Sequence, residues 1–455
     1  MRRAFRRPRN GWTSVWLGAV ALTLSACATY HPVPLPTGPD LARAAALRIA
    51  PGRLRIPGLK PHPVRAAKGL DVVDVVILAV VNNPELKAER LRAGVARAEL
   101  LQAGLLPDPQ LSASFTHPSS GPPPLTDGHE LGLSQALRAL VTRSTARAGA
   151  QAHRRQVNLQ ILWREWQVAR QARQLFIRVR AEDRLGRILG TRARLDAQRY
   201  ARDRTALQKG ILSLSTVSAD LANLLDAQTR LRQLQRRRNE SWHALDALLG
   251  LVPGTVPTLR GSPDITVFTA AQFRQAVRNL PRRRPDLLAL QAGYHSQEEA
   301  VRRAILEQFP AFSVGLTRRR DTGDVSSAGF GVTLTLPLFN RNQGHIAIQR
   351  ATRAALRQAY QARLDEAVNQ AHALWQTAQL LSRQLHQLRA RLPVLRRTAQ
   401  AARRSFREGN LSAGTYISLR SRLLAERSQR VSLTASLQSA QAALETVLGM
   451  TLGGQ

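Results

Sequence analysis

The chain contains a single cysteine among its 455 residues, Cys27, so no disulfide can form within one copy. Its ten histidines are scattered, and no two lie three or four residues apart, as zinc ligands on one helix face would. No glycine-rich phosphate loop follows a strand-like segment, and no serine or cysteine has the sequence context of a nucleophile. We therefore expect no enzyme, no cofactor and no bound metal.

Lysine is also scarce: only four of the 67 basic residues are lysine, and arginine supplies the others. The formal net charge is +37 at pH 7. A nucleic-acid-binding protein gathers such charge in a patch, whereas here it is spread along helix-like runs. We therefore expect no nucleic-acid partner. The positive surface favours anionic lipid headgroups or acidic partners instead.

Residues 1–26 have the pattern of a signal peptide, with a basic start and an apolar run that is too short for a membrane-spanning helix. This segment leads into Leu24-Ser25-Ala26-Cys27, which resembles the lipobox of bacterial lipoproteins. The resemblance implies cleavage before Cys27 and lipidation of its thiol. Ala28 stands where lipoproteins retained in the inner membrane carry aspartate, which implies the outer membrane.

The chain repeats itself at a spacing of about 200 residues. The matching landmarks are Pro84 with Pro285, Pro109 with Pro310, Gly210 with Gly409, and Gly250 with Gly449. The first two pairs are 201 residues apart and the last two are 199 apart. This spacing indicates a tandem duplication. We expect a proline-rich, extended lead-in over residues 27–69, a first repeat over 70–250, a linking segment over 251–269 and a second repeat over 270–455.

Each repeat contains two segments in which apolar and small polar residues alternate, the pattern of a β-hairpin with two different faces. The strands are expected at about 109–117 and 130–137 in the first repeat, and at about 310–319 and 328–338 in the second. In a membrane, the apolar face would lie on lipid and the small polar face on a water-filled lumen. Four strands cannot close a barrel, so this interpretation requires several copies. A half-buried sheet of a soluble protein is the alternative.

Two very long helices follow the hairpins, over about Arg138–Gln208 and Asn342–Glu408. Each is roughly 100 Å long at 1.5 Å per residue. Gly210 or Gly409 separates each long helix from a return helix of about 35 residues. The expected packing face of the first long helix includes Leu159, Leu162, Trp166, Ala169 and Phe176. The predicted fold is mainly α with a small β part.

Two runs resemble the TolC-type family of outer-membrane efflux ducts, and the resemblance extends over residues 28–455. Arg284-Pro285-Asp286-Leu287-Leu288 resembles a run that is common in the family. The run from Leu336 to Gly344 resembles the strand-to-helix junction of the CzcC-type subgroup, the outer-membrane component of cobalt–zinc–cadmium efflux systems. The junction residues are Pro337, Leu338, Phe339, Asn340 and Gly344.

The resemblance implies a homotrimer whose twelve strands form an outer-membrane barrel, continued in the periplasm by an α-helical barrel. Residues 251–269 would contribute to a belt around the middle of the helical part. The family's partners are a periplasmic membrane-fusion adaptor, an inner-membrane pump, here expected to be of the RND type, and outer-membrane lipid. The implied adaptor-docking tips are Gly210, Leu212 and Ser213 in the first repeat, and Gly409, Leu411 and Ser412 in the second.

The family's gate is not matched. Some members carry an acidic ring six and nine residues beyond the second tip glycine, where this chain has Thr415 and Ser418. Asp220, near the first tip, is an alternative carboxylate, although a solvated helix surface is the simpler expectation for it. Arg420 or Arg422, pairing with a neighbouring subunit, is another possibility for the gate.

The sequence thus predicts a passive, lipid-anchored outer-membrane conduit, with heavy-metal cations as its cargo. A duct for drugs or other organic compounds is the alternative within the family. Outside the family, the alternatives are a periplasmic adaptor, which has one helical hairpin, and a coiled-coil scaffold, which lacks the alternating strands.

Overall fold

The computed structural model describes residues 30–42, 48–49, 64–65, 69–121, 124–263 and 268–450. The chain divides into two units, Met1–Leu41 and Ala42–Gln455. In the first unit, residues 30–41 form neither helix nor strand and are exposed to solvent. The expected signal peptide, Cys27 and most of the lead-in lie outside the described residues.

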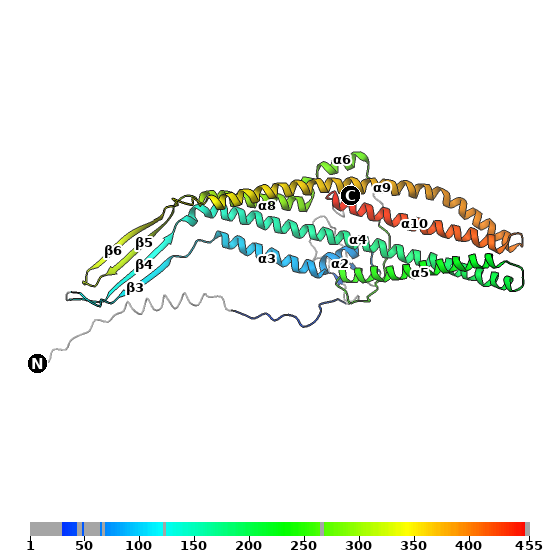
Figure 1. The fold of residues 1–455 in the computed structure, drawn as a ribbon, viewed down its shortest axis with the longest axis horizontal. Helices are drawn as coiled ribbons and strands as arrows, with labels where there is room; N and C mark the ends of the chain where they lie inside the picture. The colour runs from blue at the N-terminus through cyan, green and yellow to red at the C-terminus, as the bar shows by residue number, and fades with distance from the viewer. Residues whose placement is uncertain are drawn as a thin grey trace. The chain divides into compact units, whose positions relative to one another are not determined.

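In the second unit, one order of elements occurs twice: short helices, a β-hairpin, a long helix and a return helix (Figure 1). The first set comprises α2 (Val72–Asn82), α3 (Pro84–Gly104), β3 (Gln110–Thr116), β4 (Gly128–Ala136), α4 (Arg138–Gln208) and α5 (Leu214–Leu248). The second comprises α6 (Ala270–Arg278), α7 (Leu280–Arg283), α8 (Pro285–Leu306), β5 (Ala311–Arg320), β6 (Ser326–Thr335), α9 (Gln343–Arg407) and α10 (Ala413–Val447). The predicted class, mainly α with a small antiparallel sheet, is confirmed.

Two further strands of two residues each, β1 (Arg48–Ile49) and β2 (Val64–Arg65), pair with each other. The segment between the repeats is held by backbone bonds to the lead-in. Ala42 forms a parallel bridge with Leu251, and Leu70 forms one with Leu259. These bridges join the linking segment to Ala42, within the lead-in, and to Leu70, at the start of the first repeat.

Four helix ends use the same local structure. After α4, α5, α9 and α10 the chain turns at Gly210, Gly250, Gly409 and Gly449, each of which has a positive φ. At the first of these, Ile211 N–H donates to Ala206 O and Gly210 N–H donates to Leu207 O, both at 2.9 Å. This is the Schellman arrangement, which favours glycine because a side chain is strained at positive φ. The repeated glycines therefore mark repeated helix ends.

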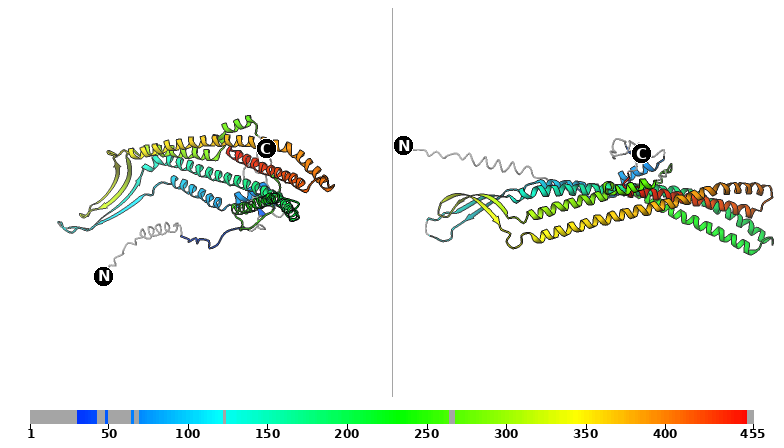
Figure 2. Two further views of the ribbon diagram at one scale, coloured as in Figure 1. Left: turned by 45° about the vertical axis from the view of Figure 1, so that its right-hand side comes forward. Right: turned by 90° about the horizontal axis from the view of Figure 1, so that it is seen from above.

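Helix α4 is the centre of the packing. It contacts α2 and α3 of its own repeat, its return helix α5, and both α8 and α10 of the second repeat. Helix α9 packs against α8 and α10. Within the second unit, the sheet lies at one end and the α4–α5 and α9–α10 turns lie at the other (Figures 1 and 2).

The expected packing face of α4 is only partly right. Ala169 and Phe176 are buried, but Leu162 is 37% exposed and its neighbour Ile161 is buried in its place. Because α4 is contacted by helices on several sides, its buried positions do not follow one stripe at steps of three and four residues.

Candidate functional site

The two repeats join in one four-stranded antiparallel sheet of order β3-β4-β5-β6. The central pair connects the repeats, from His129 opposite Arg320 to Ala136 opposite Ser313. Among the described strands, β3 and β6 have a neighbour on one side only. Their outer edges therefore present open rows of backbone donors and acceptors, which can bind a strand from another chain.

One face of the sheet is apolar and uncovered. A cross-strand row on this face takes one residue from each strand: Leu111, Leu133, Leu316 and Phe330. The next rows contain Val314 opposite Val332 and Phe312 opposite Leu334. Exposed fractions range from 48% for Leu133 to 76% for Leu111 in the first row. A soluble monomer rarely exposes a contiguous apolar face, so this surface requires another environment or partner.

The opposite face is small and polar. One row consists of Ser112, Gly132, Thr317 and Gly329. The next consists of Gln110, Ser134, Gly315 and Gly331. The expected alternation therefore holds across all four strands. The last strand is shorter than expected, since β6 ends at Thr335 instead of about residue 338.

The predicted junction residues form a sharp turn between β6 and α9. Arg341 and Asn342 both have positive φ, and the Asn342 side-chain amide donates to Ala304 O of α8 at 2.8 Å. This bond fixes the start of α9 against the end of α8. Leu338 is largely exposed and Phe339 is fully exposed, so this turn presents apolar side chains to its surroundings just beyond the last strand. Pro337 and Asn340 lie within the turn, and Gly344 lies in the first turn of α9.

The two predicted tips are built alike. Gly210 and Gly409 adopt positive φ, and Ser213 and Ser412 cap the return helices by accepting from the backbone N–H of residues three positions later. Leu212 and Leu411 are half-buried. At the first tip, the neighbouring side chains of Ile211 and Leu214 are exposed. These residues therefore form the turns, and they present apolar surface at the first one.

Asp220, ten residues beyond the first tip glycine, belongs to a cluster of charged residues with Arg199 and Asp203. The expectation that Asp220 lies on a solvated helix surface was wrong. Asp220 is 2% exposed, so it is not on a solvated surface. Its carboxylate pairs with Arg199 Nε of α4 at 2.7 Å. Burial raises the pKa of Asp220, and a hydrogen bond with the Asp203 carboxyl raises it further, although the Arg199 charge acts in the opposite sense. The local sequence conceals this because the partner of Asp220 lies on the preceding helix.

Thr415 and Ser418, where the sequence has no acidic ring, both lie on α10. Arg199 Nη1 donates to Ser418 Oγ at 3.2 Å, which links α4 to α10. Thr415 lies at the first turn of α10, where its backbone N–H is capped by Ser412. Within the chain, Arg420 donates to the Tyr416 hydroxyl at 3.0 Å and Arg422 pairs with Glu426 at 3.1 Å.

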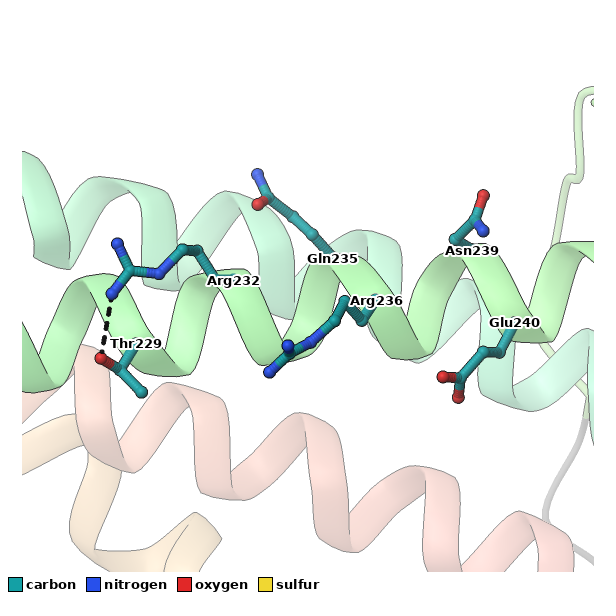
Figure 3. Close-up of a pocket in the computed structure, with 6 residues that line it drawn as sticks. All are labelled: Thr229, Arg232, Gln235, Arg236, Asn239 and Glu240. Atoms are coloured by element: carbon teal, nitrogen blue, oxygen red, sulfur yellow. Dashed lines mark hydrogen bonds between the residues drawn. The ribbon is translucent and has the colours of Figure 1, made fainter.

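A groove of about 570 Å³ runs along α5. Its lining residues all belong to that helix: Thr229, Arg232, Gln235, Arg236, Asn239 and Glu240 (Figure 3). Arg232 donates to Thr229 Oγ1 at 3.2 Å. The groove contains one carboxylate and no nucleophile–base pair, so it does not resemble a catalytic site.

No group of three or more potential metal ligands occurs in the parts of the chain that the structure describes. Over those same residues, no helix has both the length and the hydropathy of a membrane-spanning helix.

Residues 276–450 match the protein family described as "Outer membrane efflux protein". The proteins of this family are passive channels rather than enzymes, in agreement with the expectation that this chain has no catalytic role. A search of curated proteins gave no match to the sequence.

Several solved structures share the fold. CusC, described in terms of transmembrane channel formation, matches with a TM-score of 0.68 and 18% identity over 93% of this chain and 100% of its own. A membrane protein from Pseudomonas aeruginosa gives 0.70 and 18%, over 84% of this chain and 91% of its own. The CmeC outer-membrane channel of Campylobacter jejuni gives 0.67 and 14%, over 93% and 95%. At these identities the likeness establishes the fold.

Proposed function

We propose that this chain is one subunit of an outer-membrane efflux duct, which passively conducts a substrate delivered from an inner-membrane pump. The observation that carries the proposal is the sheet, with an exposed apolar face, a small polar face and two open edges. A sheet of this kind satisfies its edges and covers its apolar face when identical copies close it into a barrel in lipid.

Three copies are the expected assembly. Four strands from each subunit would give twelve, which exceeds the eight or so that a spanning barrel needs. The small polar side chains and glycines of the second face would line the lumen. Helices α4, α5, α9 and α10 of the three subunits would continue the duct into the periplasm.

The tips are the proposed adaptor-docking sites. Gly210 and Gly409 place two similar turns at the end remote from the sheet, and exposed Ile211 and Leu214 supply apolar contact area at one of them. The adaptor would connect these turns to the pump. Because we identify no nucleotide-binding motif in the sequence, the energy for transport is assigned to the pump, which we propose to be of the RND type.

The proposed anchor is a lipid on Cys27. A Cys27→Ser variant should lose lipidation, which metabolic labelling with a fatty acid would detect, while trimers still form. Loss of all assembly in this variant would show that the duct depends on the anchor for its assembly.

Heavy-metal cations are the proposed cargo, on the strength of the junction run from Leu336 to Gly344. Deletion of the gene should then sensitise the bacterium to zinc, cobalt or cadmium salts more than to organic drugs. The reverse pattern would assign the duct to drug efflux. An adaptor or a pore-free scaffold is disfavoured, because neither needs a sheet with exposed apolar rows.

The duct is tested by conductance of the purified full chain in a planar bilayer. Substitutions at two adjacent residues of β5 distinguish the role of the apolar face from that of the polar face. Leu316→Arg places a charge on the apolar face and should prevent insertion, since a cation facing lipid costs about 2–4 kcal/mol per copy at the bilayer centre. Thr317→Arg places the same charge on the polar face and should insert normally but conduct cations less well. Equal behaviour of the two variants, or absence of conductance by the unmodified chain, would refute the proposal.

A further inference from the structure

Three consecutive arginines, Arg318, Arg319 and Arg320, end strand β5 beside the hairpin loop, and all three are exposed. Because side chains alternate along a strand, the first and third lie on the apolar face and the second lies on the polar face. The pairing of β5 with β4 and β6 agrees with this assignment of the side chains to the two faces. Arg318 is opposite Leu131 and Ala328, in the row next to that of Leu133 and Leu316. The apolar face therefore ends in two arginines at its loop end.

The two faces differ in how this charge is balanced. On the polar face, Arg319 lies directly opposite Glu130 of β4. On the apolar face, Arg320 pairs with Asp324 of the loop, and Arg318 has no ion pair among the described residues. His129 lies directly opposite Arg320, and no carboxylate stands in the rows of Arg318 and Arg320. Of the two arginines on this face, Arg318 therefore has no carboxylate partner among the described residues, and Arg320 is balanced only by Asp324 of the loop.

We propose that Arg318 and Arg320 bind the phosphate of an anionic lipid headgroup at the loop end of the sheet. This inference rests on the proposed function, in which the apolar face meets lipid. The guanidinium groups would bind phosphate oxygens in pairs, while their aliphatic stems and the side chains of Leu131 and Leu316 would lie against the acyl chains. Inorganic phosphate has no acyl chains, so it cannot gain the free energy of apolar contact with this surface that a lipid gains. A trimer would present six such arginines around one rim.

The strand provides its own control. Arg319 has the same charge and neighbours in sequence, but faces the polar side opposite Glu130. Loss of Arg318 and Arg320 should therefore change lipid binding, whereas loss of Arg319 should not. Asp324 offers a test in the other direction, because an Asp324→Asn variant frees Arg320 from its ion pair and should strengthen headgroup binding.

The experiment uses the purified full chain in phosphatidylcholine vesicles containing a spin-labelled lipid, either phosphatidylglycerol or phosphatidylcholine. The fraction of motionally restricted label gives the preference for the anionic headgroup. Each arginine near a charged surface contributes about fivefold to such a preference. The unmodified chain should prefer phosphatidylglycerol severalfold, and an Arg318→Gln/Arg320→Gln variant should lose that preference. Arg319→Gln should retain it, Arg318→Lys/Arg320→Lys should retain most of it, and Asp324→Asn should increase it.

Equal loss in Arg319→Gln and in the double variant would overturn the proposal, as would the absence of any headgroup preference in the unmodified chain. Displacement of the labelled lipid by inorganic phosphate at the same ionic strength would show a site for free phosphate and would also overturn it. If the unmodified chain restricts neither label, it has not entered the bilayer, and the proposed function fails along with this site. If it restricts both labels equally, only the present inference fails.

Discussion

The two helical hairpins, α4–α5 and α9–α10, have nearly the same geometry but different chemistry between their helices. Their return helices are both 35 residues long, and both tips combine a glycine of positive φ with a serine cap. In the first hairpin, ion pairs cross between the helices, from Arg199 to Asp220 at 2.7 Å and from Arg238 to Asp183 at 2.6 Å. Over the described residues, no ion pair connects α9 with α10. That contact is an apolar cluster that includes Leu385, Leu388 and Leu433.

Alignment of the two repeats shows which residues cause this difference between the hairpins. At a spacing of 199 residues, the buried carboxylates Glu182, Asp196 and Asp220 correspond to Leu381, Leu395 and Leu419. Burial is the largest cause that raises the pKa of each of the three acids. The length of the return helix and the structure of the tip are therefore the same in both copies, while the buried carboxylates of the first copy correspond to leucines in the second. We expect the first hairpin to respond to pH and to loss of single charges, and the second to respond to neither.

The largest expected effect is on the buried pair at the first tip. Arg199→Ala leaves the Asp220 carboxylate buried without its counter-charge and should lower the free energy of unfolding of this hairpin by on the order of 3 kcal/mol. Hydrogen exchange of the α4–α5 amides in the full chain measures this. Arg202→Ala removes an exposed arginine nearby and should leave exchange unchanged. An equal effect of both variants would contradict a role for the pair.

A second variant introduces the chemistry of the second hairpin. The repeat equivalents of Arg199 and Asp220 are Thr398 and Leu419. Arg199→Thr with Asp220→Leu removes both charges together, and should restore stability to within about 1 kcal/mol of the unmodified chain, since apolar replacement of a whole buried pair is often neutral. A double variant as unstable as Arg199→Ala would show that the polar contacts are specifically required.

The tip glycines should behave equally in the two hairpins. Gly210 and Gly409 have φ of 71° and 77°, and a Cβ added at either would meet nothing within 4 Å. Alanine there should cost about 1–2 kcal/mol of backbone strain alone, seen as faster local exchange. Gly190→Ala, inside α4, should instead stabilise by about 0.5–1 kcal/mol. A large difference between Gly210→Ala and Gly409→Ala would reveal a contact made at only one tip.

The dependence of stability on pH should also differ between the two hairpins, although by less than the effects of the substitutions above. The raised pKa values of Glu182, Asp196 and Asp220 mean that the folded first hairpin binds more protons than the unfolded chain, in the range from their ordinary pKa values up to the raised ones. Its stability should therefore fall as pH rises through that range and level off above it. After correction for the chemical exchange rate, α4–α5 amides should exchange faster as pH rises, while α9–α10 amides serve as the internal control. The same trend in both hairpins would contradict the assignment.

The smallest effect is expected from the exposed arginines of α9. Arg389, Arg396 and Arg403 are spaced by seven residues, are exposed, and have no ion pair among the described residues. Replacing all three with glutamine should change the unfolding free energy by less than about 0.5 kcal/mol per site, because surface charges contribute little to stability. Chemical denaturation at low and high salt provides the measurement. A large loss of stability would mean that these side chains make contacts within the fold.

The local features of the sequence predicted the elements well. The expected limits of α4, Arg138 and Gln208, are those observed, because a Schellman turn at Gly210 ends the helix. The alternating residues placed all four strands to within a few positions. Both failures concern long-range packing. Leu162 was assigned to a packing face that passes through Ile161, because α4 is contacted by helices from both repeats. Asp220 was assigned to a solvated surface because its partner Arg199 is 21 residues away. The repeat alignment held the missing signal, since Asp220 corresponds to a leucine.

The central claim is that the open edges of β3 and β6 meet in neighbouring copies. Cysteines at Ser112 of β3 and at glycines 329 or 331 of β6, in a Cys27→Ser background, test it directly by oxidation in the membrane. The account predicts dimers and trimers on a non-reducing gel, with no larger species, for at least one of the two pairings. Absence of any cross-link, or a ladder that continues beyond three copies, would contradict it.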